Sequence, residues 1–526
     1  MLPRAYRFLH TWIHYTGILL MIAGLPFSVF LMSLSQFFLA GNWILEGGYK
    51  DKITRFTNNG PALLLSGIFM LNAISYLWSE NSHEALKMLR INLPLFLFPF
   101  LVSGRAPLST KVFGIFLRLF ILSVFLSVVV CAVIGLPRWI DGTFADIREV
   151  SLFISHIRFS LLIDLALLLS LWLWFQPSVY LWSFERYALP LVALLLLLFL
   201  LILQSLNGIF ILAAVGLGWF LLTPSNATSR KIKRTASWVL VSGMILLGYT
   251  LSASWHQYFT PAAIYSRPLS QKTVLGNAYR HQLDLIENGH YVHAFVCESE
   301  LRAEWQLKSK VNIDSLDQKG HPIYETLIRY LNSLGLPKDS VGIHSLKTTD
   351  IRNIENGMAN FRYAGWFGLR MRFYQLMYEV SFMRSGAKNA SGHSVMMKLE
   401  FWKTAFFLIK ENPLLGYGIG DVPDSFKLYY KANNSWLHNK WWMTAHNQYL
   451  YWAVSSGLVA LVLYLLCFFG PLGYAYVRRN RPFMLYFSIA AIAMLTEDML
   501  TTQAGVSFIA FFYSFFLFCK PQNDAL

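Results

Sequence analysis

The sequence predicts an all-α membrane protein that crosses the bilayer many times. Its 526 residues are 55% hydrophobic and 16% aromatic, whereas only 14% are charged. A soluble protein would carry about a quarter charged residues. Here long apolar runs recur, and the charged residues lie between them. The composition therefore excludes a disordered protein and an ordinary soluble one.

The apolar runs predict about twelve membrane-spanning helices, because about 20 apolar residues are needed to cross the hydrocarbon core. Two details stay open. The first two runs could form one helix kinked at Pro26, and the two runs around Asn207 could form one long hairpin. The predicted spans are 12–25, 27–45, 62–79, 89–104, 110–136, 156–175, 188–204, 206–223, 236–255, 449–476, 483–499 and 503–519.

The basic residues predict which side of the membrane each loop faces. With the N-terminus inside, the inner segments hold sixteen Lys and Arg residues, and the short outer loops hold three. This bias follows the positive-inside rule. It predicts a bundle of about nine helices over 1–255, a loop domain on the outer side over 256–445 and about three helices over 446–526.

The loop domain is expected to be mostly helical, with amphipathic stretches near 322–335, 366–384 and 395–411. The string Gly416-Tyr417-Gly418-Ile419-Gly420-Asp421 superficially resembles a phosphate-binding loop. It lacks the preceding strand that such a loop needs, so a tight turn that closes the loop domain is the favoured interpretation.

Ionisable residues at the membrane boundary are costly and are therefore candidates for function. The predicted topology places several of them in one layer at the outer ends of helices, next to the loop domain. A site for a lipid-linked substrate would lie there. These residues are Arg90, His156, Arg158, His446, Glu497 and Asp498, together with the polar residue Asn207.

Two of these residues have side chains suited to transfer chemistry. An imidazole such as that of His446 can accept a proton from a hydroxyl near neutral pH. A guanidinium such as that of Arg158 binds phosphate oxygens in two places and keeps its proton. The alternatives are a histidine that only anchors its helix and an arginine that meets lipid headgroups.

In these residues the chain resembles the O-antigen ligase and polymerase family of bacterial membrane glycosyltransferases, and within it the Bacteroidetes-type branch. The pair His446-Asn447, followed by Gly457, is the most specific motif, and the glycine-rich string supports it. The resemblance covers nearly the whole chain. It also rests on His156 to Ser160, Gln204 to Gly208, Thr326 to Leu331, Lys398 to Trp402, Asn412 to Asp421, Ala445 to Leu450 and Thr496 to Asp498.

The resemblance implies a GT-C-type fold with a large periplasmic loop between the ninth and tenth helices. It also implies transfer of a glycan from undecaprenyl diphosphate to an acceptor hydroxyl, with His446 as base or as the group that orients the acceptor. The family's arginines bind the diphosphate, but this chain has Asn207 and Lys398 where many members have arginine.

Arg158 is therefore the favoured diphosphate contact, with Lys398, Arg372 and Arg370 as further cations. The expected supporting residues are His156, Asn447, Asn207, Glu497 and Asp421.

No cofactor, metal ion or nucleic acid is expected. The loop domain carries no Asp-x-Asp motif, and the diphosphate already has protein cations, so the transfer is predicted to be metal-independent.

The predicted function is that of an O-antigen ligase in the bacterial inner membrane, with its active site facing the periplasm and lipid A-core as acceptor. A repeat-unit polymerase and a protein O-oligosaccharyltransferase are alternatives that differ in the acceptor, and a polysaccharide flippase or exporter is the alternative from another class. Sequence alone leaves open the acceptor, the sugars, the glycan length and the oligomeric state.

Overall fold

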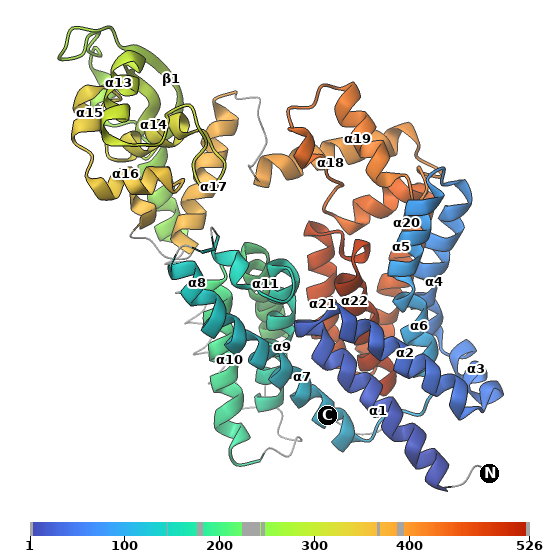
Figure 1. Ribbon diagram of the computed structural model, residues 1–526. Helices are drawn as coiled ribbons and strands as arrows, with labels where there is room; N and C mark the ends of the chain where they lie inside the picture. The colour runs from blue at the N-terminus through green and yellow to red at the C-terminus, as the bar shows by residue number, and fades with distance from the viewer. Residues whose placement is uncertain are drawn as a thin grey trace. The chain divides into compact units, whose positions relative to one another are not determined.

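The computed structural model describes residues 4–141, 143–144, 146–175, 182–222, 242, 248–364, 369–386 and 394–521 (Figure 1). The chain forms two compact units. Unit 1 comprises residues 1–222 and 397–526, and unit 2 comprises residues 223–396. This division differs from the predicted loop domain, because residues 397–445 group with the apolar helices.

Unit 1 contains the apolar helices, which are the feature that most closely matches the prediction, together with the short polar helix α3. They are α1 (Arg4–Phe27), α2 (Val29–Glu46), α3 (Tyr49–Thr57), α4 (Gly60–Ser75), α5 (Ser82–Asn92), α6 (Pro94–Ser103), α7 (Thr110–Val130), α8 (Leu136–Ile140), α9 (His156–Phe175), α10 (Glu185–Ile202), α11 (Leu206–Leu222), α20 (Gln448–Val477), α21 (Arg481–Thr496) and α22 (Gln503–Ser514).

Among the described residues, eight helical segments are long and apolar enough to cross a membrane, and three shorter apolar helices accompany them. This confirms an all-α polytopic membrane protein. The first two predicted spans are separate helices, because Ser28 has an extended backbone and its Oγ accepts a hydrogen bond from the Leu31 N–H. The predicted span 236–255 falls mostly outside the described residues, where helical backbone is described from 248 to 259.

Three segments that the charge pattern placed on the inner side meet at one end of unit 1. Lys52 of α3 forms an ion pair of 2.7 Å with Glu46 at the end of α2, and Arg105 pairs with the same carboxylate. The Leu108 N–H donates to the Cys519 carbonyl at 2.9 Å. These helix ends therefore lie together, and the side of the membrane that they face stays a prediction.

Unit 1 also contains two helices from the segment predicted as a loop domain: residues 397–411 of α18 (Ser394–Glu411), and α19 (Val422–Ala432). Asp421, just before α19, accepts hydrogen bonds from the backbone N–H groups of Glu80 at 2.9 Å and Asn81 at 2.8 Å. The turn before α5 is thereby joined to a segment some 340 positions later in the sequence.

The glycine-rich string packs against α20 and is not a phosphate loop. Tyr417 and Gly418 donate backbone hydrogen bonds to the carbonyls of Val454 and Ser455, at 2.9 and 2.8 Å. Gly457 interrupts α20 with a φ of 77°, and a Cβ there would lie 2.0 Å from the Leu414 carbonyl oxygen. Only glycine permits this approach, which explains the spacing between the string and Gly457.

Unit 2 consists of helices that pack on a β-hairpin, and the hairpin was not predicted. The antiparallel strands β1 (Arg280–Glu287) and β2 (His290–Val296) are joined by Asn288 and Gly289, whose φ angles are 55° and 78°. The helices are α13 (Glu298–Lys308), α14 (Ile323–Ser333), α15 (Ser340–His344), α16 (Thr348–Glu355) and α17 (Leu369–Arg384).

Candidate functional site

A cavity of about 450 Å³ in unit 1 brings together residues from three distant parts of the chain. Arg158 comes from the start of α9, His446 from the segment before α20, and Glu497 and Asp498 from the segment between α21 and α22. The full lining is Ile157, Arg158, Pro423, Lys427, Trp442, Met443, Thr444, His446, Glu497, Asp498, Thr501 and Thr502.

The start of α20 fixes the position of His446. Asn447 is the N-cap residue of this helix, and its side-chain oxygen accepts the backbone N–H groups of Tyr449 at 3.0 Å and Leu450 at 3.1 Å. His446 lies directly before the cap with a φ of 45°, a left-handed conformation that is uncommon for residues other than glycine. Such conformations concentrate at functional sites, where the surrounding structure holds them.

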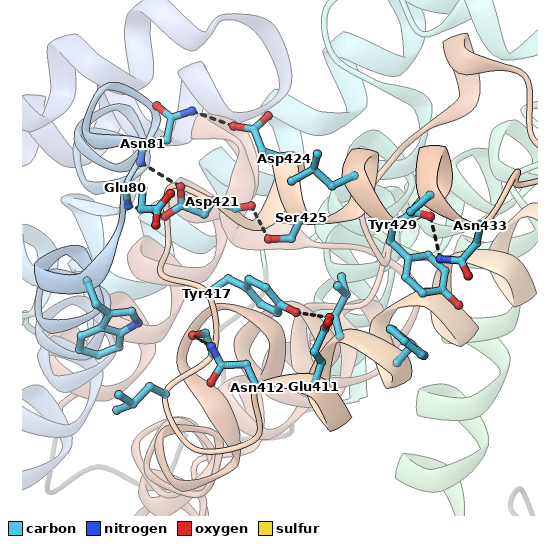
Figure 2. Close-up of a pocket in the computed structure, with 17 residues that line it drawn as sticks. Glu80, Asn81, Glu411, Asn412, Tyr417, Asp421, Asp424, Ser425, Tyr429 and Asn433 are labelled. Atoms are coloured by element: carbon cyan, nitrogen blue, oxygen red, sulfur yellow. Dashed lines mark hydrogen bonds between the residues drawn. The ribbon is translucent and has the colours of Figure 1, made fainter.

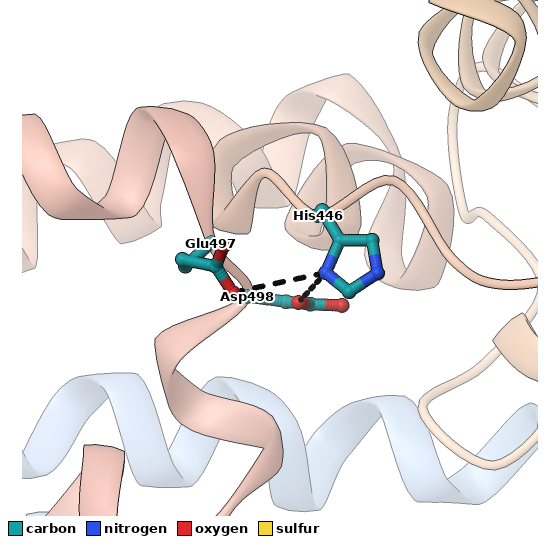
Figure 3. A group of neighbouring side chains, drawn as sticks. All are labelled: His446, Glu497 and Asp498. Atoms are coloured by element: carbon teal, nitrogen blue, oxygen red, sulfur yellow. Dashed lines mark ion pairs between the residues drawn. The ribbon is translucent and has the colours of Figure 1, made fainter. Parts of the chain in front are cut away.

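Two carboxylates hold the imidazole of His446 from the same side (Figure 3). Nδ1 lies 3.2 Å from Asp498 Oδ1 and 3.8 Å from Glu497 Oε2. The Thr444 hydroxyl donates to the other oxygen of Asp498 at 2.6 Å, which keeps that carboxylate in place. Both carboxylates pair with Nδ1, whereas Nε2 contacts the Met443 sulfur, a weak acceptor, at 3.3 Å. Nε2 is therefore the nitrogen that a reacting hydroxyl would approach in place of this sulfur.

The carboxylates also set the charge of the histidine. Burial alone would lower the pKa of His446, but the interactions with Asp498 and Glu497 outweigh it and raise the pKa to about 9. Burial would likewise raise the pKa of Asp498, but His446 and Thr444 outweigh it and hold this pKa below its ordinary value. At neutral pH the group is therefore mainly an imidazolium beside carboxylates.

Arg158 lies in the first turn of α9 with part of its guanidinium buried. One terminal nitrogen donates to the Ser155 hydroxyl at 3.3 Å. Its Nε is buried and has no hydrogen-bond partner among the described residues. Arg158 also borders a small apolar pocket with Leu25, Leu161 and Phe508 among its lining residues. The side chain thus connects a polar cavity with an apolar one.

Comparison with known proteins identifies the segment that carries the histidine. Residues 356–465 match the O-antigen ligase family model. Over these residues the match confirms the resemblance to the family predicted from the sequence, and it supports a membrane glycosyltransferase of the ligase or polymerase type. A search of curated proteins finds no match to this chain.

The O-antigen ligase segment supplies only part of the cavity. It contains Lys427, Thr444 and His446. Arg158 comes from α9, and Glu497 and Asp498 come from the segment between α21 and α22, all outside the matched range. The folded chain therefore brings side chains from outside the matched segment into the same cavity.

Lys398 and Asn207 lie near the cavity but do not line it. The Lys398 ammonium donates to the Thr496 carbonyl at 3.0 Å and lies 4.0 Å from Glu497. Asn207 accepts a hydrogen bond from the Thr496 hydroxyl at 2.8 Å. Both residues thus contact Thr496, which directly precedes Glu497, and support the turn that presents this carboxylate.

The remaining predicted residues have other positions. Asn447 caps α20, and Asp421 joins α19 to the start of α5. His156 begins α9 but is not among the residues that line the cavity. Arg370 and Arg372 belong to α17 of unit 2, and their proposed contact with the diphosphate stays a prediction.

Two features of the cavity were not assigned from the sequence. Asp498 is the carboxylate nearer to His446, although Glu497 was the predicted neighbour. Lys427 of α19 lines the cavity as a second basic residue beside Arg158. The sequence signal that could have revealed Lys427 is the amphipathic pattern of residues 422–432, in which Pro423 and Lys427 share one helix face.

The predicted independence from metal ions can be tested directly at this cluster. This cluster offers one nitrogen or oxygen atom from each of His446, Glu497 and Asp498. These three atoms lie within 4.8 Å of one another, a spacing that a cation could use. We expect full transfer activity after treatment with a chelator, because ion pairing to the imidazolium occupies the carboxylates. Strict dependence on added Mg²⁺ or Mn²⁺ in a purified-protein assay would contradict this expectation.

Proposed function

We propose that the protein is an O-antigen ligase that transfers a glycan from undecaprenyl diphosphate to lipid A-core at the periplasmic face of the inner membrane. The observation that carries this proposal is the cavity in which His446, held by two carboxylates, faces the same space as Arg158 and Lys427. A proton acceptor and cations for a leaving diphosphate are the two groups that such a transfer needs.

The chemistry is a displacement at the anomeric carbon of the donor sugar. The acceptor oxygen forms a bond to this carbon while the bond to the diphosphate oxygen breaks. The acceptor proton passes to Nε2 of the neutral form of His446, and undecaprenyl diphosphate leaves with the bonding electrons. Arg158 and Lys427 stabilise the negative charge that grows on the leaving group, and this interaction is stronger in the transition state than before it.

The cluster of charged groups at one end of the helices favours an enzyme over a flippase. Transporters usually bind their cargo near the middle of the membrane, between broken helices. Here the candidate groups lie at the ends of α9, α20 and α21. Substrate movement across reconstituted vesicles without a new glycosidic bond would reverse this choice.

A deletion strain complemented with the wild-type gene tests the acceptor. Lipopolysaccharide and glycoproteins are separated side by side on gels. The proposal requires that the polysaccharide ladder on intact lipid A-core disappears in the deletion strain and returns with the gene. Loss of protein glycosylation with an unchanged ladder would instead identify a protein O-oligosaccharyltransferase, and loss of chain length alone would identify a polymerase.

The raised pKa of His446 predicts how transfer depends on pH. Below about 9 most of the imidazole is protonated, so the neutral form that acts as a base increases with pH. We expect kcat/KM to rise toward a plateau above about pH 9 in a detergent-solubilised assay.

Asp498→Asn provides the control for this profile. It removes the nearer negative charge, so the midpoint should move from about 9 toward the ordinary imidazole value of 6.5. A rate that instead falls as the pH rises through 9 would show that the imidazolium is the active form.

A further inference from the structure

Unit 1 contains a second, larger cavity of about 1170 Å³, which we call the aromatic cavity (Figure 2). It lies between the turn before α5, the end of α18 and one face of α19. Its volume exceeds the range of about 300–1,000 Å³ that is typical of small-molecule sites. Its lining includes Trp78, Asn81, Phe407, Glu411, Tyr417 and Tyr429.

The helix α19 separates the two cavities. Successive residues of an α-helix are rotated by about 100°. Pro423 and Lys427 therefore share the face that borders the His446 cavity, whereas Ser425 and Leu428 lie on the far side and border the aromatic cavity, with Asp424 at the edge between the two faces. One helix thus contributes to both spaces.

The aromatic cavity offers flat rings next to groups that form directional hydrogen bonds. The Phe407 and Tyr429 rings are 4.7 Å apart at their centroids. The Tyr417 hydroxyl donates to Glu411 Oε2 at 2.7 Å, which leaves the second oxygen of this carboxylate for a ligand. Asn433 stands beside Tyr429 and donates to its carbonyl at 3.0 Å (Figure 2).

The charge of the lining restricts the ligand. The residues that line this cavity in the described part of the chain include four carboxylates, from Glu80, Glu411, Asp421 and Asp424, and no Lys or Arg. Asp421 accepts the backbone N–H groups of Glu80 and Asn81, and Asp424 pairs with Lys427 at 3.3 Å, so the negative charge toward a ligand rests mainly on Glu80 and Glu411. Phosphates and uronic acids would meet like charge there. Sugar rings fit better, because their C–H faces pack on aromatic rings and their hydroxyls pair with carboxylates and amides.

We propose that the aromatic cavity binds a neutral or amine-bearing oligosaccharide. This inference deepens the proposed function and rests on it, since the sugar would belong to one of the two glycans that the reaction at His446 joins. The chemistry is shared by the donor glycan and by the core oligosaccharide of the acceptor, and the experiment distinguishes these two sources.

Binding to the full-length protein tests the proposal without turnover. The His446→Ala variant serves as background, and the probes come from a deletion strain. One arm compares undecaprenyl-diphosphate-linked glycan with bare undecaprenyl diphosphate, and the other compares lipid A-core with lipid A. In one arm we expect the glycan to tighten binding about tenfold, and Tyr429→Ala to remove this gain.

Further variants show whether the effect comes from the cavity. Glu411→Gln keeps the shape of the wall and removes one charge, so it should weaken the same arm without unfolding the protein. Lys431→Ala lies on α19, lines neither cavity and should leave both arms unchanged. Glycan-dependent binding that survives both Tyr429→Ala and Glu411→Gln, or no glycan-dependent binding in either arm, would overturn the proposal.

The outcome is separable from that of the proposed function. If the complemented strain shows no transfer but the glycan gain is present and depends on Tyr429, the sugar site stands and the ligase assignment fails. If transfer occurs and the gain is absent, the ligase assignment stands and the sugar site fails.

Discussion

Replacing His446 with alanine is expected to reduce glycan transfer by about 10²- to 10⁴-fold, the usual contribution of a positioned general base. The imidazole is the group in the cavity whose Nε2 can take the acceptor proton, since Nδ1 faces Asp498 and Glu497. Initial rates with purified protein and extracted donor lipid would measure the loss, while membrane expression and the thermal unfolding midpoint should stay near wild type.

A matched histidine provides the control for this variant. His83 is exposed on α5 and lines neither cavity, so His83→Ala should transfer at the wild-type rate. Full ligation by a well-expressed His446→Ala protein would reject the base role, and the two carboxylates would then have only a structural function.

The helices and their grouping could be predicted from the sequence because both follow from local properties. The length of each apolar run sets the span, and the distribution of basic residues predicts which side of the membrane each helix end faces. These two rules placed Arg158, His446 and Glu497 in one layer, and the structure brings these side chains to one cavity. The roles assigned to the three residues remain predictions.

The features that were missed depend on contacts between distant segments. Nothing local shows that Asp421 accepts hydrogen bonds from Glu80 and Asn81, and this is one of the contacts that join α19 to the apolar helices. Polarity alone suggested that residues 397–445 belong to a separate loop domain. The cavity wall that carries Lys427 was therefore not foreseen.

The β-hairpin of unit 2 is a different kind of omission, because its signal is local. Asn288-Gly289 lies between two runs that alternate polar and apolar residues. The positive φ angles of both residues are those of the two-residue turns that join hairpin strands. The helical period of the surrounding segments predicts a mostly helical domain, and the hairpin is the exception to it.

Replacing Arg158 with lysine should reduce kcat/KM by about ten- to a hundredfold, even though the positive charge is kept. A guanidinium can hold two diphosphate oxygens at once, whereas an ammonium is a point charge. Loss of one hydrogen bond to a charged group costs about 1.5–3 kcal/mol, and each 1.4 kcal/mol is about a tenfold change.

Comparison with two further variants separates geometry from charge. Arg158→Ala removes both and should be slower than Arg158→Lys. Arg138→Lys changes an exposed arginine on α8 that does not line the cavity, and it should behave as wild type. Since Arg158 borders both the polar cavity and the apolar pocket with Leu161, its loss should also weaken binding of bare undecaprenyl diphosphate. Normal turnover and normal donor affinity in Arg158→Lys would remove this residue from the site and leave Lys427 as the cation of the cavity.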